Sequence, residues 1–318
     1  LTSSRAFLLP AIVWTYLVAG TGDFTPGGIL EGRLEGGYLG LLLGLFVFGI
    51  GKAAVMPTHA WLPAAMVAPT PVSALLHAVA VVKAGVFTVT KVIVYVFGVD
   101  FLFGEPSSGW LFYAAAFTII AASLVALRQQ NLTRLLAYST VAQLSYVVMA
   151  SAILKPLAEV GATIHMVAHA FGKITLFFAA GAIYTASRKT ELVQLRGIGR
   201  RMPITMTAFT IGALSMIGVP PTAGFVSKWY ILAGAFQADH YLALATIVAS
   251  TALNAAYFLP IIYWVWFGQD ATPPGKEHGE APFTILLALA ATAALTIAFF
   301  AYSAPVYELE AQLVQVQP

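Results

Sequence analysis

Long runs of apolar residues, separated by short polar, glycine-rich or proline-rich connections, fill most of the chain. Because a helix needs about 20 consecutive apolar residues to cross a bilayer, each run is interpreted as one membrane span. The nine predicted spans cover residues 6–21, 37–62, 71–97, 109–127, 132–154, 158–185, 203–237, 241–267 and 282–304. The pattern therefore predicts an all-α, polytopic membrane helix bundle, with residues 1–318 forming one transmembrane domain.

Proline interrupts two of these spans. Pro57 falls in the second span and Pro63 directly follows its end, and Pro220 and Pro221 fall in the seventh. Broken backbone at membrane depth survives where it lines a cavity or is enclosed by protein, and transporters place discontinuous helices at their ion sites, often in matched halves. The prolines therefore predict two discontinuous helices and inverted-repeat halves. The alternative is that they only kink long helices.

Composition supports a membrane protein and excludes several functions. Hydrophobic residues make up 59% of the chain and charged residues 9%, whereas a soluble domain has roughly a quarter charged residues. No room is left for a nucleotide-binding domain, and the net charge of +3 does not indicate nucleic-acid binding. The chain contains no cysteine, which excludes disulfides, iron–sulfur ligation and thiol catalysis. We expect no cofactor.

The basic residues of the loops are distributed unevenly. With nine spans, nine of them fall on one side of the membrane, namely Arg5, Arg128, Arg134, Arg188, Lys189, Arg196, Arg200, Arg201 and Lys276. Only two fall on the other side, Arg33 and Lys155. The positive-inside rule then makes the first side cytoplasmic. It places the C-terminus, with Glu308 and Glu310, outside.

Five lysines fall inside predicted spans: Lys52, Lys83, Lys91, Lys173 and Lys228. A lysine at the bilayer centre costs about 2.5–3.5 kcal/mol, and such residues usually face a bundle interior or a water-filled path. Lys91 lies near a helix end and can extend to the interface. All thirteen Asp and Glu residues map to loops or helix ends, so we expect the four deeper lysines to be enclosed without a carboxylate partner and able to exchange protons. The alternative is a structural lysine bonded to carbonyls.

Histidines extend this set of titratable groups. His77 shares a span with Lys83, and His165, His169 and Lys173 recur at i, i+4 and i+8 along one helix face. A zinc site is the competing interpretation, but the sequence offers no cysteine, no carboxylate away from the loops and helix ends, and no glutamate between the two histidines. We expect no metal. The sequence predicts one proton relay, formed by Lys52, His77, Lys83, His165, His169, Lys173 and Lys228.

Residues 51–77 read GKAAVMPTHAWLPAAMVAPTPVSALLH. This segment resembles the signature of the antiporter-like family, which comprises large subunits of Mrp-type multisubunit Na+/H+ antiporters and proton-pumping membrane-arm subunits of complex I. The resemblance continues through residues 83–87, 135–140, 165–173 and 218–228. It covers essentially the whole chain.

The resemblance implies a role for each titratable residue. Lys52 would be the central proton-accepting lysine of a first half-channel, and Lys83 the connecting lysine, as in D-type antiporter subunits. His165, His169 and Lys173 match the polar axis of the second half, while Lys228 matches the residue through which protons leave. Thr133 stands where many relatives have a lysine, which leaves that loop position without one of its cations.

The implied function is that of a proton-translocating subunit of a multisubunit cation/proton antiporter, exchanging Na+ for H+ in a prokaryotic inner membrane. The alternative is a proton-pumping membrane subunit of a redox complex, of the NADH:quinone oxidoreductase or membrane-bound hydrogenase type. In both cases the chain performs no covalent chemistry and its partners are other membrane subunits. Family members have about fourteen spans, and these nine resemble the last nine. We therefore expect another segment or subunit to supply an acidic partner for Lys52. An intramembrane hydrolase is disfavoured, because no carboxylate within a span could orient a catalytic histidine.

Overall fold

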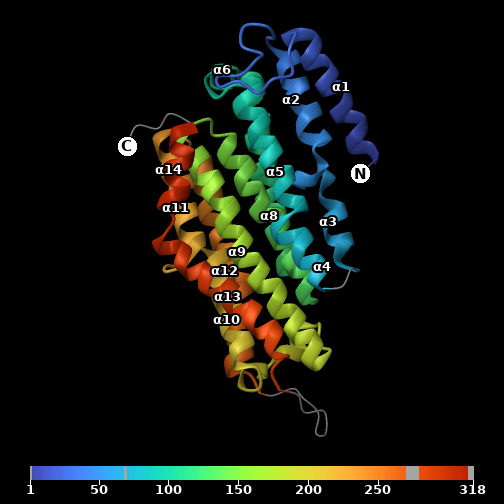
Figure 1. The fold of residues 1–318 in the computed structure, drawn as a ribbon, viewed down its shortest axis with the longest axis vertical. Coiled ribbons are helices and arrows are strands. Elements are labelled where there is room, and N and C mark those ends of the chain that lie inside the picture. Colours follow the sequence, from blue (N-terminus) through green and yellow to red (C-terminus); the bar gives the residue numbers. More distant parts are fainter. Residues whose placement is uncertain (1, 68–69, 270–278, 314–318) are drawn as a thin grey trace.

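A computed structural model of the chain describes residues 2–67, 70–269 and 279–313. These residues form an elongated helical bundle whose main helices run roughly along its longest axis (Figure 1). Within these ranges the only β-type pairing is an isolated bridge between Asn131 and Glu191. The prediction of an all-α bundle is confirmed.

The first half of the chain contains the shorter and more irregular helices. Its α-helices are α1 (Thr2–Ala19), α2 (Gly37–Gly49), α3 (Trp61–Ala64), α4 (Thr70–Ala74), α5 (Val81–Val92), α6 (Val99–Gly104), α7 (Trp110–Leu127) and α8 (Leu132–Ser151). Short 3-10 or π segments connect several of them, among them η1 (Gly51–Ala53), η2 (Thr58–Ala60), η4 (Leu75–Val79) and η5 (Ile93–Phe97).

The second half contains the two longest helices, α9 (Pro156–Ser187) and α12 (Tyr241–Phe267). Its other helices are α10 (Pro203–Ile217), α11 (Ala223–Gln237), α13 (Phe283–Ala301) and α14 (Ala304–Leu313). Four segments in the described ranges are long and apolar enough to cross a membrane: Pro106–Leu127, Pro156–Ser187, Tyr241–Phe267 and Phe283–Ala301. The count of nine spans remains a prediction. The final helix, α14, falls beyond the last predicted span.

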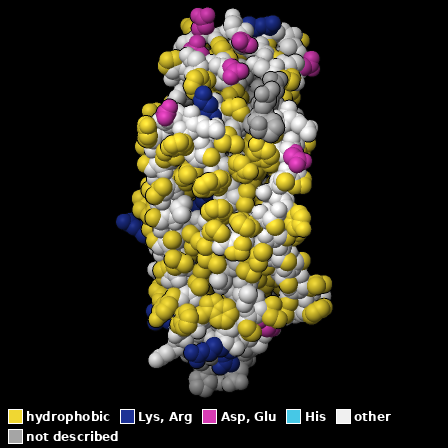
Figure 2. Space-filling model, turned by 90° about the vertical axis from the view of Figure 1, so that its left-hand side faces the viewer, with side chains coloured by type: hydrophobic (Ala, Val, Ile, Leu, Met, Phe, Trp, Pro, Cys, Tyr) yellow, Lys and Arg dark blue, Asp and Glu magenta, His cyan; other side chains and the backbone are white. Residues whose placement is uncertain are grey.

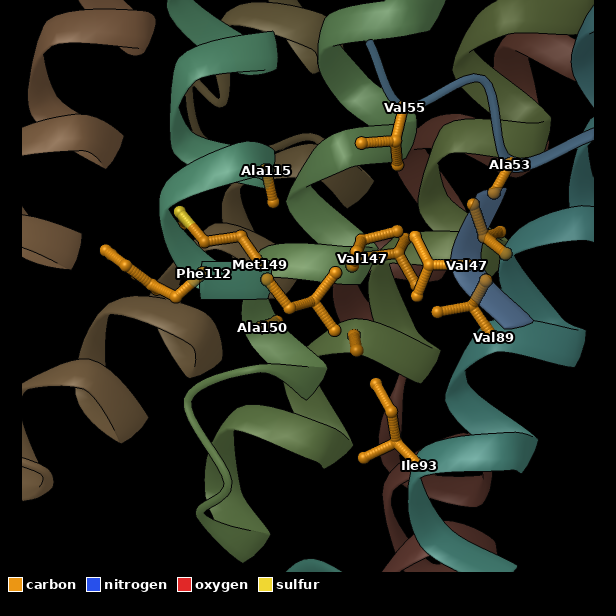
Figure 3. Close-up of a cluster of buried hydrophobic side chains, with 14 of the residues drawn as sticks. Val47, Ala53, Val55, Val89, Ile93, Phe112, Ala115, Val147, Met149 and Ala150 are labelled. Carbon is orange, nitrogen blue, oxygen red and sulfur yellow. The ribbon is translucent and has the colours of Figure 1, made fainter. Parts of the chain in front are cut away.

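An apolar core joins α2 and α5 to α7 and α8. Val47 of α2 and Val89 of α5 converge on Val147 of α8, and Phe112 of α7 closes the far side (Figure 3). All four side chains are at most 2% exposed. Ala53 and Val55 belong to the same buried cluster, which explains why the interrupted segment around η1 is held against regular helices.

The charged loops gather at the ends of the bundle. Backbone hydrogen bonds from Leu132 to Thr190 (2.9 Å) and from Leu192 to Gln130 (2.8 Å) bring the α7–α8 and α9–α10 loops together. These loops carry most of the basic residues that the sequence predicts for the cytoplasmic side. Two others, Lys276 and the side chain of Arg5, lie outside the described part of the chain. Figure 2 shows a mostly hydrophobic middle, with acidic side chains near one end and a group of basic side chains at the other.

Helices α9 and α11 lie antiparallel and in unusually close contact. A Cβ on Gly161 would lie 2.7 Å from the backbone nitrogen of Ile231, and a Cβ on Gly234 would lie 2.5 Å from that of Ala158. Only glycine permits this approach. The same register continues along the pair and brings His165 next to Ser227, which positions the site.

Candidate functional site

The break between α10 and α11, at Pro220 and Pro221, leaves free backbone carbonyl groups that bind a lysine. The carbonyl groups of Met216 and Ile217 would normally accept hydrogen bonds from residues 220 and 221, but both of those are prolines, which have no N–H. Lys228 Nζ instead donates to Met216 O at 3.0 Å and to Ile217 O at 2.9 Å. Because the C-terminal end of α10 also carries the negative pole of its helix dipole, the break stabilises a cation there.

A buried network of amides and hydroxyls surrounds this point. Met216 O also accepts hydrogen bonds from Gln143 Nε2 at 3.2 Å and from Asn254 Nδ2 at 3.3 Å. The hydroxyl of Tyr257 is hydrogen-bonded to Asn254 and, at 3.0 Å, to Ser139 Oγ. One carbonyl at the end of α10 therefore connects α8, α11 and α12 through polar side chains.

The two histidines of α9 lie between two lysines. Lys83 Nζ of α5 is 2.8 Å from His169 Nδ1, and the rings of His169 and His165 have centroids 6.1 Å apart. His165 Nδ1 is hydrogen-bonded to Ser227 Oγ at 2.9 Å, and Ser227 precedes Lys228 in α11. Both histidines are 1% exposed. Residues from α5, α9 and α11 thus form a continuous row of titratable and hydroxyl groups.

Tyr146 of α8 completes this row from the other side. Its ring centroid lies 5.5 Å from that of His165, and Lys228 Nζ lies 5.2 Å from the same tyrosine centroid. Tyr146 is 0% exposed and its hydroxyl donates to Ile247 O at 3.4 Å. The aromatic face therefore contacts both the imidazole and the ammonium.

Lys173 lies one turn beyond His169 on α9. It is 0% exposed, and its Nζ donates to Leu136 O of α8 at 3.1 Å. The partner is a backbone carbonyl, as for Lys228. This ammonium therefore lies beside α8, next to the row that links Lys83 to Lys228. Across the described residues, no three His, Asp or Glu side chains form a group that could hold a metal ion.

The remaining residues singled out from the sequence include Lys91, His77 and the four prolines, which differ in position. Lys91 is half-buried, with Nζ 4.4 Å from the ring centroid of Phe24, a cation–π contact near the end of its helix. His77 lies on η4, one turn before α5, and its side chain falls outside the described part. Pro57 precedes η2, whereas Pro63 lies inside α3. Pro220 and Pro221 lie between α10 and α11.

The expectation that Lys52 is enclosed within this chain is wrong. Lys52 lies on η1, between Ile50 and the left-handed Ala54 at φ 57°, and its side chain is exposed. One side of η1 packs so tightly on α5 that a Cβ on Gly85 would lie 2.3 Å from the Lys52 carbonyl carbon. The lysine side chain leaves the opposite side, which the described helices do not cover. This is where the sequence predicted an additional partner.

One carboxylate that the sequence places at a helix end is enclosed in the structure. Glu159 lies in the first turn of α9, as the spans predicted, but it is 0% exposed. The reason is that α14 folds back over the beginning of α9. The sequence predicts the last span to end at residue 304 and the tail with Glu308 and Glu310 to lie on the outer side, so it does not predict α14.

Several polar residues of the site were not predicted. Gln143, Tyr146, Ser227, Asn254 and Tyr257 all lie inside apolar spans and are at most 4% exposed. Spacing offered a signal, because Gln143 and Tyr146 are three apart, as are Asn254 and Tyr257, so each pair shares a helix face. The sequence prediction considered only charged residues and histidine, so it did not include these amide and hydroxyl side chains.

Comparison with known proteins places this arrangement in a family. The family model described as "NADH:quinone oxidoreductase/Mrp antiporter, TM" matches residues 2–254. The chain belongs to this family. It is 35% identical over 289 residues to NADH-quinone oxidoreductase subunit N of Desulforudis audaxviator, an alignment covering 88% of this chain and 56% of that protein. It is 36% identical over 239 residues to subunit L of Rickettsia bellii, covering 75% and 36% of the two chains.

Solved structures of membrane complexes share the fold. A chain of the Mrp complex from Dietzia sp. DQ12-45-1b superimposes with a TM-score of 0.85 at 21% identity, covering 98% of this chain and 65% of that one. A chain of respiratory complex I from Thermus thermophilus gives 0.75 at 26% identity, with coverage of 96% and 66%. The resemblance deduced from sequence is therefore confirmed. The chain spans about a third to two thirds of the length of these relatives.

Proposed function

We propose that this family member conducts protons across a membrane as part of a multisubunit cation/proton antiporter, in exchange for Na+. The observation that supports it is the continuous row from Lys83 through His169 and His165 to Ser227 and Lys228. Each ionisable member can gain and lose a proton. Contacts join Lys83, His169, His165 and Ser227 in turn, and the ring of Tyr146 contacts both His165 and Lys228.

The partners of the lysines suit such a role. Lys173 and Lys228 donate to carbonyl groups, and Lys83 contacts an imidazole. A carboxylate partner would hold an ammonium in its charged form through a strong ion pair. Neutral partners accept hydrogen bonds from both the charged and the neutral amine, so each lysine can release its proton without losing its place.

A second coupling is supported by the relatives. Those with 35% and 36% identity are named as NADH-quinone oxidoreductase subunits, and a chain of an archaeal membrane-bound sulfane sulfur reductase superimposes with a TM-score of 0.81 at 26% identity. The same proton path would then serve a redox complex. Coupling would reside in the other membrane subunits, because the chain itself offers no cysteine for an iron–sulfur cluster.

The test compares two driving forces on the complex that contains this chain. The complex is reconstituted in liposomes with an internal pH indicator, and either a Na+ gradient or a redox substrate with quinone is supplied. Proton movement driven by the Na+ gradient, lost in Lys228→Ala, is expected. Movement that needs the redox substrate alone would replace the antiporter with the redox pump. Absence of movement under both conditions would contradict proton translocation.

We also propose that the end bearing α14 faces outward and that the end bearing Arg128 and Arg188 faces the cytoplasm, following the positive-inside rule. The cysteine-free chain allows a direct measurement. Glu308→Cys should react with a membrane-impermeant maleimide in intact cells, whereas Arg188→Cys should react only after permeabilisation. Both positions are exposed. The reverse labelling pattern would invert the orientation.

Replacing Lys52 is expected to stop ion translocation without lowering the yield of the complex. The side chain is exposed on this chain, so Lys52→Ala leaves no internal cavity, but it removes the cation expected to face an acidic group of another segment or subunit. Translocation is measured as dissipation of a pH gradient in vesicles, and yield by purification. Lys91→Ala is the matched control and should have a mild effect. Normal translocation in Lys52→Ala would remove this lysine from the relay.

A further inference from the structure

An isolated carboxylate is enclosed at the beginning of α9. Glu159 is 0% exposed, and neither Oε1 nor Oε2 has a hydrogen-bond partner. An ionised carboxylate without partners in apolar surroundings is strongly unfavourable. The row from Lys83 to Lys228 does not include it, so this group needs a separate explanation.

The helix that covers Glu159 carries a second carboxylate. Glu310 of α14 is half-buried, interacts electrostatically with Glu159 and is hydrogen-bonded to Thr163. Thr163 follows Glu159 by four residues, so both lie on the same face of α9. Burial raises the pKa of the Glu310 carboxyl, and the bond with Thr163 only partly opposes this. Two carboxyl groups therefore lie where α14 packs on the first turns of α9, within range of electrostatic interaction.

The surroundings of this pair are apolar and hold α14 in place. Val160, Ile164 and Phe299 form a buried cluster that Val306 and Tyr307 of α14 join. The ring of Tyr307 lies 5.3 Å, centroid to centroid, from that of Tyr230 on α11. This packing restricts water near the pair, which increases the cost of two negative charges there.

The nearest lysines are engaged elsewhere. At this end of α9, α11 and α14 the other charged or titratable groups include Lys155, Lys228, Tyr230, Tyr307 and Glu308, and His165, His169 and Lys173 follow further along α9. Lys155 Nζ lies 4.2 Å from the ring centroid of Phe103, and Lys228 binds the end of α10. Glu308 is exposed. Neither lysine is directed at the carboxyl pair by these contacts.

We propose that Glu159 and Glu310 form a cation-binding site, which holds a proton or a sodium ion between α9 and α14. Carboxylate oxygens bind both, and either cation removes the repulsion between two like charges in one enclosed place. The site is separate from the lysine and histidine row. Its use as an exchange point for the transported cation at the α14 end of the bundle rests on the proposed function, whereas cation binding itself does not.

The site is tested by infrared difference spectroscopy on the purified complex during a pH titration. The carbonyl stretch of a protonated carboxylic acid is the signal. Glu159→Gln and Glu310→Gln are each expected to remove the same band, whereas Glu308→Gln, an exposed change on the same helix, should leave it. Persistence of an unchanged band in both site variants would overturn the proposal. Two variants are used because either alone could disturb the contact of α14 with α9.

Parallel titrations in choline chloride and sodium chloride identify the cation. If the site takes Na+, the midpoint of the band moves to lower pH as Na+ replaces choline at constant ionic strength, and both site variants lose this shift. If the site takes only protons, the midpoint is the same in both salts. A complex that shows the band but moves no protons in liposomes would contradict the proposed function and leave the site standing. Proton movement in liposomes without the band would contradict the carboxylate site and leave the proposed function standing.

Discussion

Replacing Lys83 by arginine should impair proton translocation about as severely as replacing it by alanine. Lys83 Nζ contacts His169 Nδ1 at 2.8 Å, and a guanidinium could keep both the positive charge and a hydrogen bond there. It could not release its proton at any accessible pH. Since a positioned proton-transfer group contributes typically about 100-fold or more to a rate, we expect roughly that loss in both variants, measured as the initial rate of pH change in liposomes.

The comparison separates a proton carrier from a fixed charge. If Lys83 only supplies positive charge to the site, Lys83→Arg should retain most of the activity and Lys83→Ala should lose it. An active arginine variant would thus contradict the relay at this position. Lys91→Arg on the same helix is the control, because Lys91 contacts the ring of Phe24 rather than another titratable group.

The helices were largely predictable because their signal is local. A run of apolar residues long enough to cross a bilayer has few alternatives to a helix, and α7, α8, α9, α12 and α13 lie within a few residues of the predicted spans. The break before α11 was predictable for a similar reason, because Pro220 and Pro221 cannot continue a helix. The segment around Pro57 and Pro63 was predicted only as an interruption, and the π turn η4 falls inside the predicted span 71–97, because such 3-10 and π turns depend on packing against α5.

The part of the site that lies along a single helix was predictable, because helical spacing alone decides which residues share a face. The spacing of His165, His169 and Lys173 places them along α9 without knowledge of any other helix. Their partners could not be predicted in this way, because Leu136 O and Met216 O belong to other helices whose rotation is set by tertiary packing. Lys52 and Glu159 were misjudged for the same reason. Whether each is enclosed depends on what packs over it: the described helices leave Lys52 exposed, and α14 packs on the beginning of α9 near Glu159.

Gly224→Ala should prevent the second broken helix from forming its close contact and should strongly reduce the yield of the complex. A Cβ at this position would lie 1.7 Å from the Ser215 carbonyl oxygen, which is backbone and cannot move aside as a flexible side chain can. Gly224 N also donates to Ser215 Oγ at 3.1 Å. Overpacking of a well-packed contact costs about 1–3 kcal/mol and occasionally more, so we expect a loss at the upper end of that range.

The effect should extend from stability to the site, because Gly224 fixes the distance between the two halves of the broken helix. Lys228 lies one turn further along α11 and reaches back to Met216 and Ile217, so α11 cannot move away from α10 without lengthening both hydrogen bonds. Thermal unfolding of the purified complex and proton translocation in liposomes should therefore both decline. Gly104→Ala is the matched control, since a Cβ there meets nothing within 4 Å. If Gly224→Ala matched this control in both measurements, the close contact between α10 and α11 would be disproved, and with it the positioning of Lys228 by the break.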